Sequence, residues 1–244
     1  MQISVIIPMY NESKVIEKTA ALLSKYMSEH FESYEILFSD DGSTDGCAAL
    51  VQKMRLPCVR VLKSEENQGK GAAVRRGMME AEGALVLFTD ADLAYGVEVI
   101  GRFYDFYTEQ KKSAPIHVVV GSRNLDPEGY ENYSVLRRIM SKLYLRILCL
   151  LGGLRLSDSQ CGCKAFERDV AREIFSRCQV KGYAFDFEAI LWAEQLGFTL
   201  SEIPVRVLHH DESKVHILRD SFRMLCDLMG IKKSIRRTSK EKYK

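Results

Sequence analysis

The feature that most constrains this chain is a regular alternation of strand-like and helix-like segments over its first 92 residues. Short apolar runs predict buried strands, and apolar residues three or four positions apart predict the helices between them. Strands are expected at residues 2–8, 34–38, 59–62 and 85–88, and helices at residues 12–27, after residue 45 to about residue 55, and at 71–81. This alternation predicts an α/β fold with a Rossmann-like, mostly parallel sheet and helices on both faces.

The second half of the chain has a less regular pattern. Strands are expected at 116–120 and 200–208, and helices at 135–151 and in the segment that follows residue 182. Pro204 lacks a backbone N–H, so the last strand is expected at an edge of the sheet. Since no repeat or linker interrupts the pattern, we expect one domain over residues 1–230 and a basic tail over residues 231–244 that frays.

The composition argues against several classes of protein. The chain has 35 Lys and Arg against 33 Asp and Glu, a net charge of +2, so it lacks the basic excess of a nucleic-acid-binding protein. Its seven Cys include no Cys-x-x-Cys pair, which disfavours a disulfide framework or a zinc site and favours a reducing compartment. No apolar run reaches the roughly 18 residues that span a bilayer, and no cleavable signal opens the chain. We therefore expect a cytoplasmic protein, soluble or peripheral to a membrane.

Polar motifs follow each of the first four expected strands, at the point where the strand ends. These motifs are residues 10–12, 40–45, 67–71 and 90–92. Because ligands of parallel α/β sheets bind outside the carboxyl ends of the strands, we expect these four motifs to meet at one ligand site.

Each motif has more than one interpretation when taken alone. Asp90 and Asp92 are hard oxygen ligands suited to Mg²⁺ or Mn²⁺, or they form a solvated turn. Residues 40–45 either place an acid on a nucleotide base or ribose or simply cap a helix through Ser43 or Thr44. Residues 67–71 offer backbone N–H groups to a phosphate but lack the spacing of a P-loop.

Taken together, the motifs resemble a known family. The matching segments are Pro8-Met-Tyr-Asn-Glu12, Ser39-Asp-Asp-Gly-Ser-Thr-Asp45, Asn67-Gln-Gly-Lys-Gly71, Asp90-Ala-Asp92 and Gly121-Ser-Arg123. In this order they resemble the family 2 nucleotide-sugar glycosyltransferases, which have the GT-A fold. Residues 158–166 and 185–188 further resemble dolichyl-phosphate glucosyltransferases and related polyprenyl-phosphate sugar synthases. The resemblance runs from residue 3 to about residue 225, almost the whole chain.

The resemblance implies roles for individual residues. It implies that the nucleotide base and ribose are bordered by Pro8, Tyr10, Glu12 and Asp41. It implies that the diphosphate is met by Asp90, Ala91 and Asp92, with Asp90 and Asp92 as ligands of Mg²⁺ or Mn²⁺. Arg123 is expected at the transferred sugar or phosphate, and Lys214 in the donor or acceptor-phosphate region.

The chain departs from the family pattern in two respects. Many dolichol-phosphate mannose synthases have Gln two residues after the second Asp, where this chain has Ala94, so mannose specificity is less favoured. We also expect the chain to lack the transmembrane segment that many of these enzymes carry at one end. Two segments, 135–151 and 217–237, have an apolar face edged with cations. They are either interfacial helices that contact a membrane or ordinary core-facing helices with a basic side.

The expected reaction is displacement of a nucleoside diphosphate from the anomeric carbon, with inversion. We expect transfer of a hexose, glucose from UDP-glucose, to a polyprenyl or dolichyl phosphate at the cytoplasmic face of the membrane. The first alternative is a sugar-hydroxyl acceptor, which needs a base such as Asp186 or Glu188, whereas a lipid phosphate is already anionic. A second alternative is a non-catalytic domain that binds a nucleotide sugar.

Asp186 therefore has three interpretations: a base, an organiser of the acceptor site, or a buried acid paired with Lys164 or Arg123. Other residues with reactive or aromatic side chains are expected to be structural. The expected non-catalytic residues are Cys161, Cys163, His209 and His210, and the expected core residues are Tyr183, Phe187 and Trp192.

Overall fold

The computed structural model describes residues 1–130, 153, 156–208 and 227–235, and everything below concerns these residues. The strands are β1 (Ile3–Met9), β2 (Tyr34–Asp40), β3 (Val59–Lys63), β4 (Leu85–Phe88), β5 (Val118–Ser122), β6 (Lys164–Glu167) and β7 (Leu200–Pro204). They form one sheet in the order β3-β2-β1-β4-β6-β5-β7. All neighbours pair in parallel except β6, which is antiparallel to both β4 and β5.

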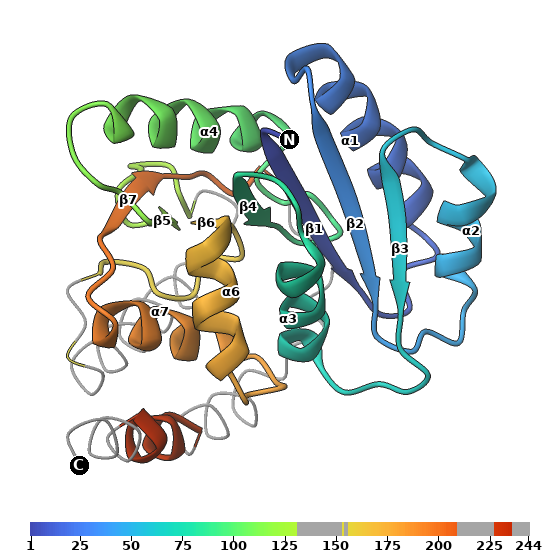
Figure 1. Cartoon of the computed structure of the whole chain (residues 1–244). Coiled ribbons are helices and arrows are strands. Elements are labelled where there is room, and N and C mark those ends of the chain that lie inside the picture. The colour runs from blue at the N-terminus through green and yellow to red at the C-terminus, as the bar shows by residue number, and fades with distance from the viewer. Residues whose placement is uncertain (131–152, 154–155, 209–226, 236–244) are drawn as a thin grey trace.

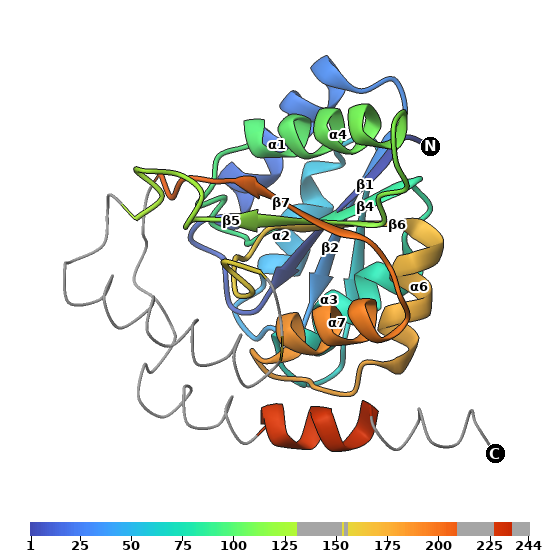
Figure 2. The same cartoon turned by 90° about the vertical axis from the view of Figure 1, so that its left-hand side faces the viewer.

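Helices cover both faces of this sheet (Figures 1 and 2). They are α1 (Ile16–His30), α2 (Cys47–Met54), α3 (Lys70–Glu80), α4 (Glu98–Lys111), α6 (Arg168–Arg177), α7 (Phe185–Gln195) and a helix at 227–235. The expected α/β fold with a mostly parallel sheet is confirmed.

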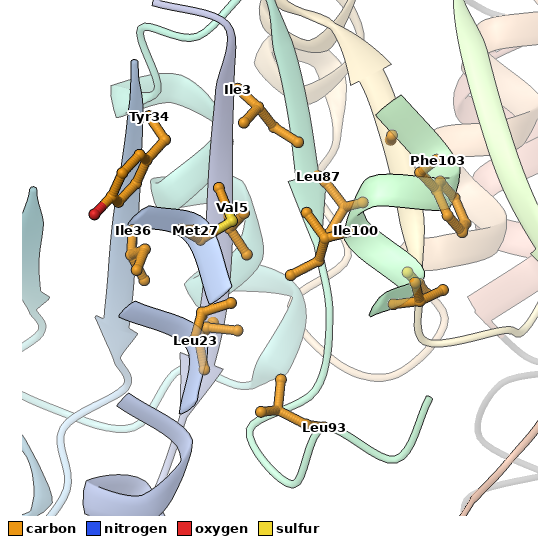
Figure 3. Packing of buried hydrophobic residues seen from close by; sticks show 14 of the residues in the cluster. Ile3, Val5, Leu23, Met27, Tyr34, Ile36, Leu87, Leu93, Ile100 and Phe103 are labelled. Atoms are coloured by element: carbon orange, nitrogen blue, oxygen red, sulfur yellow. The ribbon is translucent and has the colours of Figure 1, made fainter. Parts of the chain in front are cut away.

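The core has two layers because successive side chains of a strand point to opposite faces. Val5 of β1 packs under α1, α2 and α4, whereas its neighbour Ile6 packs under α3, α6 and α7. Figure 3 shows part of the first layer, in which Leu23 of α1 and Ile100 of α4 lie over the sheet.

The structure differs from the expected elements at several points. α1 begins at Ile16 rather than at residue 12, and β7 ends at Pro204 rather than at residue 208. β7 does lie at a sheet edge, as Pro204 predicts. β6, α4 and α6 were not predicted, although the buried residues of α4 have helical spacing.

The end of the described chain also differs from expectation. The helix at 227–235 lies beside α7 (Figures 1 and 2) and buries Leu228, Ile231 and Ile235 in the second core layer. The expected fraying from Ile231 is therefore wrong for residues 231–235. Segment 135–151, most of segment 217–237 and Lys214 lie outside the described residues. Among the described helices, none combines the length and apolar character needed to cross a bilayer.

Candidate active site

The turn after β1 is held against the loop after β2. Asn11 has a φ of 53°; its backbone N–H donates to Ser43 Oγ (3.0 Å) and its side-chain oxygen accepts from the Thr44 N–H (2.9 Å). Two residues on, the Ser13 N–H donates to Asp45 Oδ2 (2.8 Å). Residues 13–15 form a turn rather than regular helix, and the Glu12 carbonyl still accepts from the N–H groups of Val15 and Ile16 (3.0 Å each). The bonds of Asn11 and Ser13 bring the Tyr10–Glu12 turn, which includes two of the expected nucleotide contacts, beside the expected contact at Asp41.

At the start of α2, the side chain that accepts a hydrogen bond from the first helical N–H group is that of Asp45, not Ser43 or Thr44. Its Oδ1 accepts from the Cys47 N–H (3.0 Å), whereas the Ser43 hydroxyl is bonded to Asn11. The N-cap residue of α2 is Gly46, so the alternative of a cap at Ser43 or Thr44 is wrong. Burial by itself raises the pKa of the Asp45 carboxyl, but the hydrogen bonds from Ser13 and Cys47 outweigh this effect and lower the pKa to about 2.

Asp41 is buried beneath the loop after β3. Its carboxylate accepts from the backbone N–H groups of Gln68 (3.1 Å) and Gly69 (2.6 Å). Gly69 has a φ of 110° and lies so close to the Lys181 carbonyl that a Cβ there would overlap it. Asp41 therefore anchors the loop that leads into α3, and its contact with a nucleotide stays a prediction. Pro8, also expected at the nucleotide, is buried within β1.

A lysine meets the first carboxylate of the Asp90-Ala91-Asp92 motif. α3 begins at Lys70, whose ammonium forms an ion pair with Asp90 Oδ1. Burial lowers the pKa of Lys70, but the charges of Asp90 and Asp186 more than compensate and raise it above its ordinary value. Sequence reasoning considered the backbone of residues 67–71 and missed this side chain. The sequence signal that could have indicated it is a lysine at the start of a helix, directly after the loop glycine Gly69.

The backbone around Asp92 is held by neighbouring elements. Asp92 Oδ1 accepts from the Ala94 N–H (3.1 Å), and the Ala91 carbonyl accepts from the Thr19 hydroxyl of α1 (2.6 Å). On the other side, the Gly162 N–H donates to the Tyr95 hydroxyl (3.1 Å). A Cβ on Gly162 would overlap Asp90 Oδ2, so a glycine is needed for this close approach.

Asp90 and Asp92 are the acids of the site whose chemistry suits a divalent cation. Within the described residues, no group of three or more His, Cys, Asp or Glu side chains could hold a metal. Mg²⁺ commonly takes one or two protein carboxylates and completes its shell with water and phosphate oxygens, so two suffice. The Lys70 ammonium is already paired with Asp90 Oδ1, and the Gly162 backbone lies close to Oδ2. Asp90 and Asp92 are the residues that could hold the metal.

On the other side of the site, Arg123 is paired with Asp158. The guanidinium contacts the carboxylate through two bonds, Nε to Oδ2 (2.6 Å) and Nη2 to Oδ1 (2.9 Å), and both residues are buried. Burial raises the pKa of Asp158, but Arg123 holds it below its ordinary value. Glu202 of β7 accepts from the N–H groups of Ser157 (2.9 Å) and Asp158 (3.1 Å) and so holds this loop. The expected contact of Arg123 with sugar or phosphate stays a prediction.

Asp186 lies in an ion pair with Lys164. Lys164 Nζ is 3.0 Å from Asp186 Oδ1, so the third interpretation named the right partner, while the roles of base and of acceptor organiser stay predictions. Burial raises the pKa of Asp186 above its ordinary value, while Lys164 and Lys70 oppose that rise. Glu188, the other candidate base, accepts from the N–H groups of Gln179 (2.9 Å) and Val180 (2.8 Å).

The remaining expectations have mixed outcomes. Phe187 and Trp192 are buried as predicted, but Tyr183 is 38% exposed, so its assignment to the core was wrong. Cys161 and Cys163 are buried, and burial raises the pKa of Cys161 to about 11, which keeps its thiol protonated at neutral pH. His209 and His210 lie outside the described residues.

Comparison with known proteins shows the family of the chain. Residues 4–175 match the sequence model of Glycosyl transferase family 2. The chain is 33% identical to the dolichyl-phosphate beta-glucosyltransferase of Dictyostelium discoideum, over 94% of this chain and 73% of that protein. It is 34% identical to the Drosophila melanogaster protein of the same name, over 88% of this chain and 69% of that protein.

Among solved structures, the fold matches glucosyl-3-phosphoglycerate synthase from Mycobacterium tuberculosis in complex with Mn²⁺, uridine-diphosphate and phosphoglyceric acid. The TM-score is 0.68 with 19% identity, and the match covers 94% of this chain and 78% of that chain. At this identity the match establishes the fold alone. A second structure of that synthase contains Mg²⁺ and uridine-diphosphate (TM-score 0.64, 20% identity, 94% of this chain and 79% of that chain).

Proposed function

Because the chain belongs to glycosyltransferase family 2, we propose that it transfers glucose from UDP-glucose to a polyprenyl phosphate, with inversion at the anomeric carbon. The relatives at 30–34% identity, named dolichyl-phosphate beta-glucosyltransferases, support the sugar and the class of acceptor. The solved synthase with bound uridine-diphosphate supports the donor.

The ion pair of Asp186 with Lys164 is the observation that favours a lipid phosphate over a sugar hydroxyl as the acceptor. A sugar hydroxyl has to lose its proton to a base, whereas a lipid phosphate is anionic near neutral pH and needs only to be placed. If Asp186 accepted a proton, the buried Lys164 ammonium would lose its counter-charge. Glu188 is occupied by two backbone N–H groups. The two candidate bases are thus better suited to hold structure than to remove a proton.

On the donor side, we propose that the loops after β1 and β2 bind the nucleotide. The turn containing Tyr10 and Glu12 lies at the carboxyl end of β1, beside the loop that Asp41 begins. Asp90 and Asp92 are proposed to hold Mg²⁺ or Mn²⁺, which as a Lewis acid would stabilise negative charge on the leaving diphosphate. Lys70, which lies against Asp90, is placed to add a cationic donor to that diphosphate.

On the acceptor side, Arg123 and Lys214 are proposed to balance the charge of the transferred group and of the acceptor phosphate. The acceptor is membrane-bound, so we propose that the enzyme acts as a peripheral protein at the cytoplasmic membrane face. The cations in segments 135–151 and 217–237 would add roughly 1 kcal/mol each against an anionic lipid surface. Binding of the purified protein to anionic liposomes at low salt tests this part, and absence of binding contradicts it.

A transfer assay tests the proposed reaction. The protein is incubated with labelled UDP-glucose, a short polyprenyl phosphate and Mn²⁺ or Mg²⁺, and label is counted in the organic phase. We expect metal-dependent label in that phase and a loss of about two to three orders of magnitude with Asp92→Asn. Asp105→Asn, an exposed carboxylate on α4, is the control and should keep wild-type activity.

The other outcomes distinguish the alternatives. If UDP is released only when free sugars are added, the acceptor is a hydroxyl and Asp186 becomes the residue to mutate. If UDP-glucose binds but no acceptor yields UDP, the chain is a nucleotide-sugar-binding domain. Equal transfer by wild type and Asp92→Asn would remove the metal from the mechanism.

A further inference from the structure

Lys164 is a fully buried lysine in the middle of the sheet. It opens β6 and stands in register with Phe88 of β4 on one side and Val120 of β5 on the other. The residue is 0% exposed. Removing an ammonium from water is costly unless an anion and hydrogen-bond acceptors compensate it. A lysine at this position therefore needs a specific set of partners.

Three elements supply those partners. The Nζ atom donates to the Cys161 carbonyl (2.6 Å), lies 3.0 Å from Asp186 Oδ1 of α7, and stands 5.6 Å from the centre of the Phe88 ring. That ring also packs on Phe185 of α7, with 5.5 Å between the ring centres. Lys164 thus links the 161–163 loop, the end of β4 and the start of α7, all of which border the active site.

Asp186 depends on Lys164 more than on any other charge. It lies in the first turn of α7, where the helix dipole favours an anion, and it is 7% exposed. Three charged groups face it: Lys164 from β6, Lys70 from α3 and Asp90 from the end of β4. Among these, Lys164 makes the ion pair, while Lys70 is paired with Asp90. Without Lys164, the Asp186 carboxylate would be a buried anion with no ion pair of its own, facing Asp90 and a lysine, Lys70, that is already paired with Asp90.

We infer that Lys164 is the positioning residue of Asp186: its buried ammonium holds this carboxylate in place and keeps it charged beside the acceptor. The inference rests on the proposed function, in which Asp186 organises the acceptor site rather than accepting a proton. Burial raises the pKa of Asp186 and Lys164 opposes that rise, so loss of Lys164 would let the acid protonate at a higher pH.

The pH profile of glucosyl transfer tests the inference. An acid whose charge is needed gives a profile that falls as the pH drops through its pKa. In Lys164→Met we expect this acid limb, the fall in activity at low pH, to move up by at least about one pH unit. The reason is that a buried carboxylate without its cation has a higher pKa. Lys164→Arg keeps the charge and should leave the limb near its wild-type position. Asp186→Asn should abolish the limb.

Lys111→Met is the matched control. Lys111 forms an exposed ion pair with Glu167, at the opposite end of β6, and should not change the profile. An acid limb that stays in place in Lys164→Met overturns the inference. So does an equal displacement of the limb in Lys111→Met.

A stability cycle gives a second readout that does not depend on activity. The thermal midpoints of wild type, Lys164→Met, Asp186→Asn and the double variant are compared. We expect Lys164→Met to lower the midpoint and the addition of Asp186→Asn to recover part of that loss. Strictly additive changes would overturn the inference. If wild type transfers no glucose to the lipid, the proposed function fails, and the stability cycle still decides whether Lys164 holds Asp186.

Discussion

The aspartates in the two halves of the site are held in different ways, where the first half is the loop after β2 and the second half comprises the loop before β6 and the start of α7. In the first half, Asp41 and Asp45 accept hydrogen bonds from backbone N–H groups of neighbouring loops. In the second half, Asp158 and Asp186 face buried cations. Asp90 is intermediate between these two cases, because it forms an ion pair with Lys70 but its side chain remains partly exposed.

The difference has a functional consequence. A backbone N–H is a fixed dipole with no net charge, so the loops of the first half hold Asp41 and Asp45 without pairing them with a cation. This suits the role proposed for this region, which is to admit a nucleotide diphosphate and its cation. The buried pairs of the second half are neutral as pairs and costly to break. They suit a region that must keep its shape while an acceptor enters.

The largest expected effect comes from breaking a buried pair. Arg123→Met leaves the Asp158 carboxylate buried without its cation, and we expect the free energy of unfolding to fall by about 3–5 kcal/mol. Chemical denaturation measures it. Arg168→Met, which breaks an exposed pair with Asp169, should cost less than about 1 kcal/mol. Similar losses in both variants would contradict the claim that the buried Arg123–Asp158 pair is costly to break.

An intermediate effect is expected where the two halves meet. Gly162→Ala adds a methyl group that overlaps Asp90 Oδ2, and the carboxylate has to move. Since small displacements of reacting groups are costly, we expect transfer to fall about ten- to a hundredfold and the Mn²⁺ requirement to rise. Gly182→Ala is the control, because a Cβ there meets no atom within 4 Å. Wild-type kinetics in Gly162→Ala would show that Asp90 tolerates this crowding.

The smallest effect is expected for an exposed acid held by backbone. The pKa of Asp45 is about 2 in the folded protein against 3.8 ordinarily, so its charge stabilises the fold above about pH 4. That contribution is lost as the pH falls through about 2. Because the group is exposed, Asp45→Asn should cost less than about 1 kcal/mol at pH 7.

Denaturation of wild type and Asp45→Asn at several pH values measures this contribution. The two stabilities should converge as the pH falls from about 4 toward 2. A difference that grows below pH 4 would mean that the carboxylate is not held by its hydrogen bonds to Ser13 and Cys47.

Several features could have been predicted more fully from the sequence. Val99, Ile100, Phe103 and Tyr107 of α4 have the spacing of one helix face, and Val170, Ala171, Ile174 and Phe175 do the same in α6. Both helices were missed although their periodicity is local. β6 is different, because it has four residues and begins with a lysine, which does not read as a buried central strand.

The sequence by itself determined the alternation of β1 to β4 with their helices and the place of the carboxylates at the strand ends. Both depend on short-range patterns, namely the period of apolar residues and the polar residue at which each strand stops. The family resemblance rests on the same local motifs.

Only the tertiary structure decided which charges meet. Lys70 and Asp90 are 20 residues apart, and Arg123 and Asp158 are 35 apart. The local sequence pattern around each of these residues does not predict which residue it pairs with. Lys164 reaches Asp186 because β6 enters the sheet antiparallel between β4 and β5 and α7 packs over its end. An ion pair depends on the distance between two side chains in the folded chain, and that distance is set by packing.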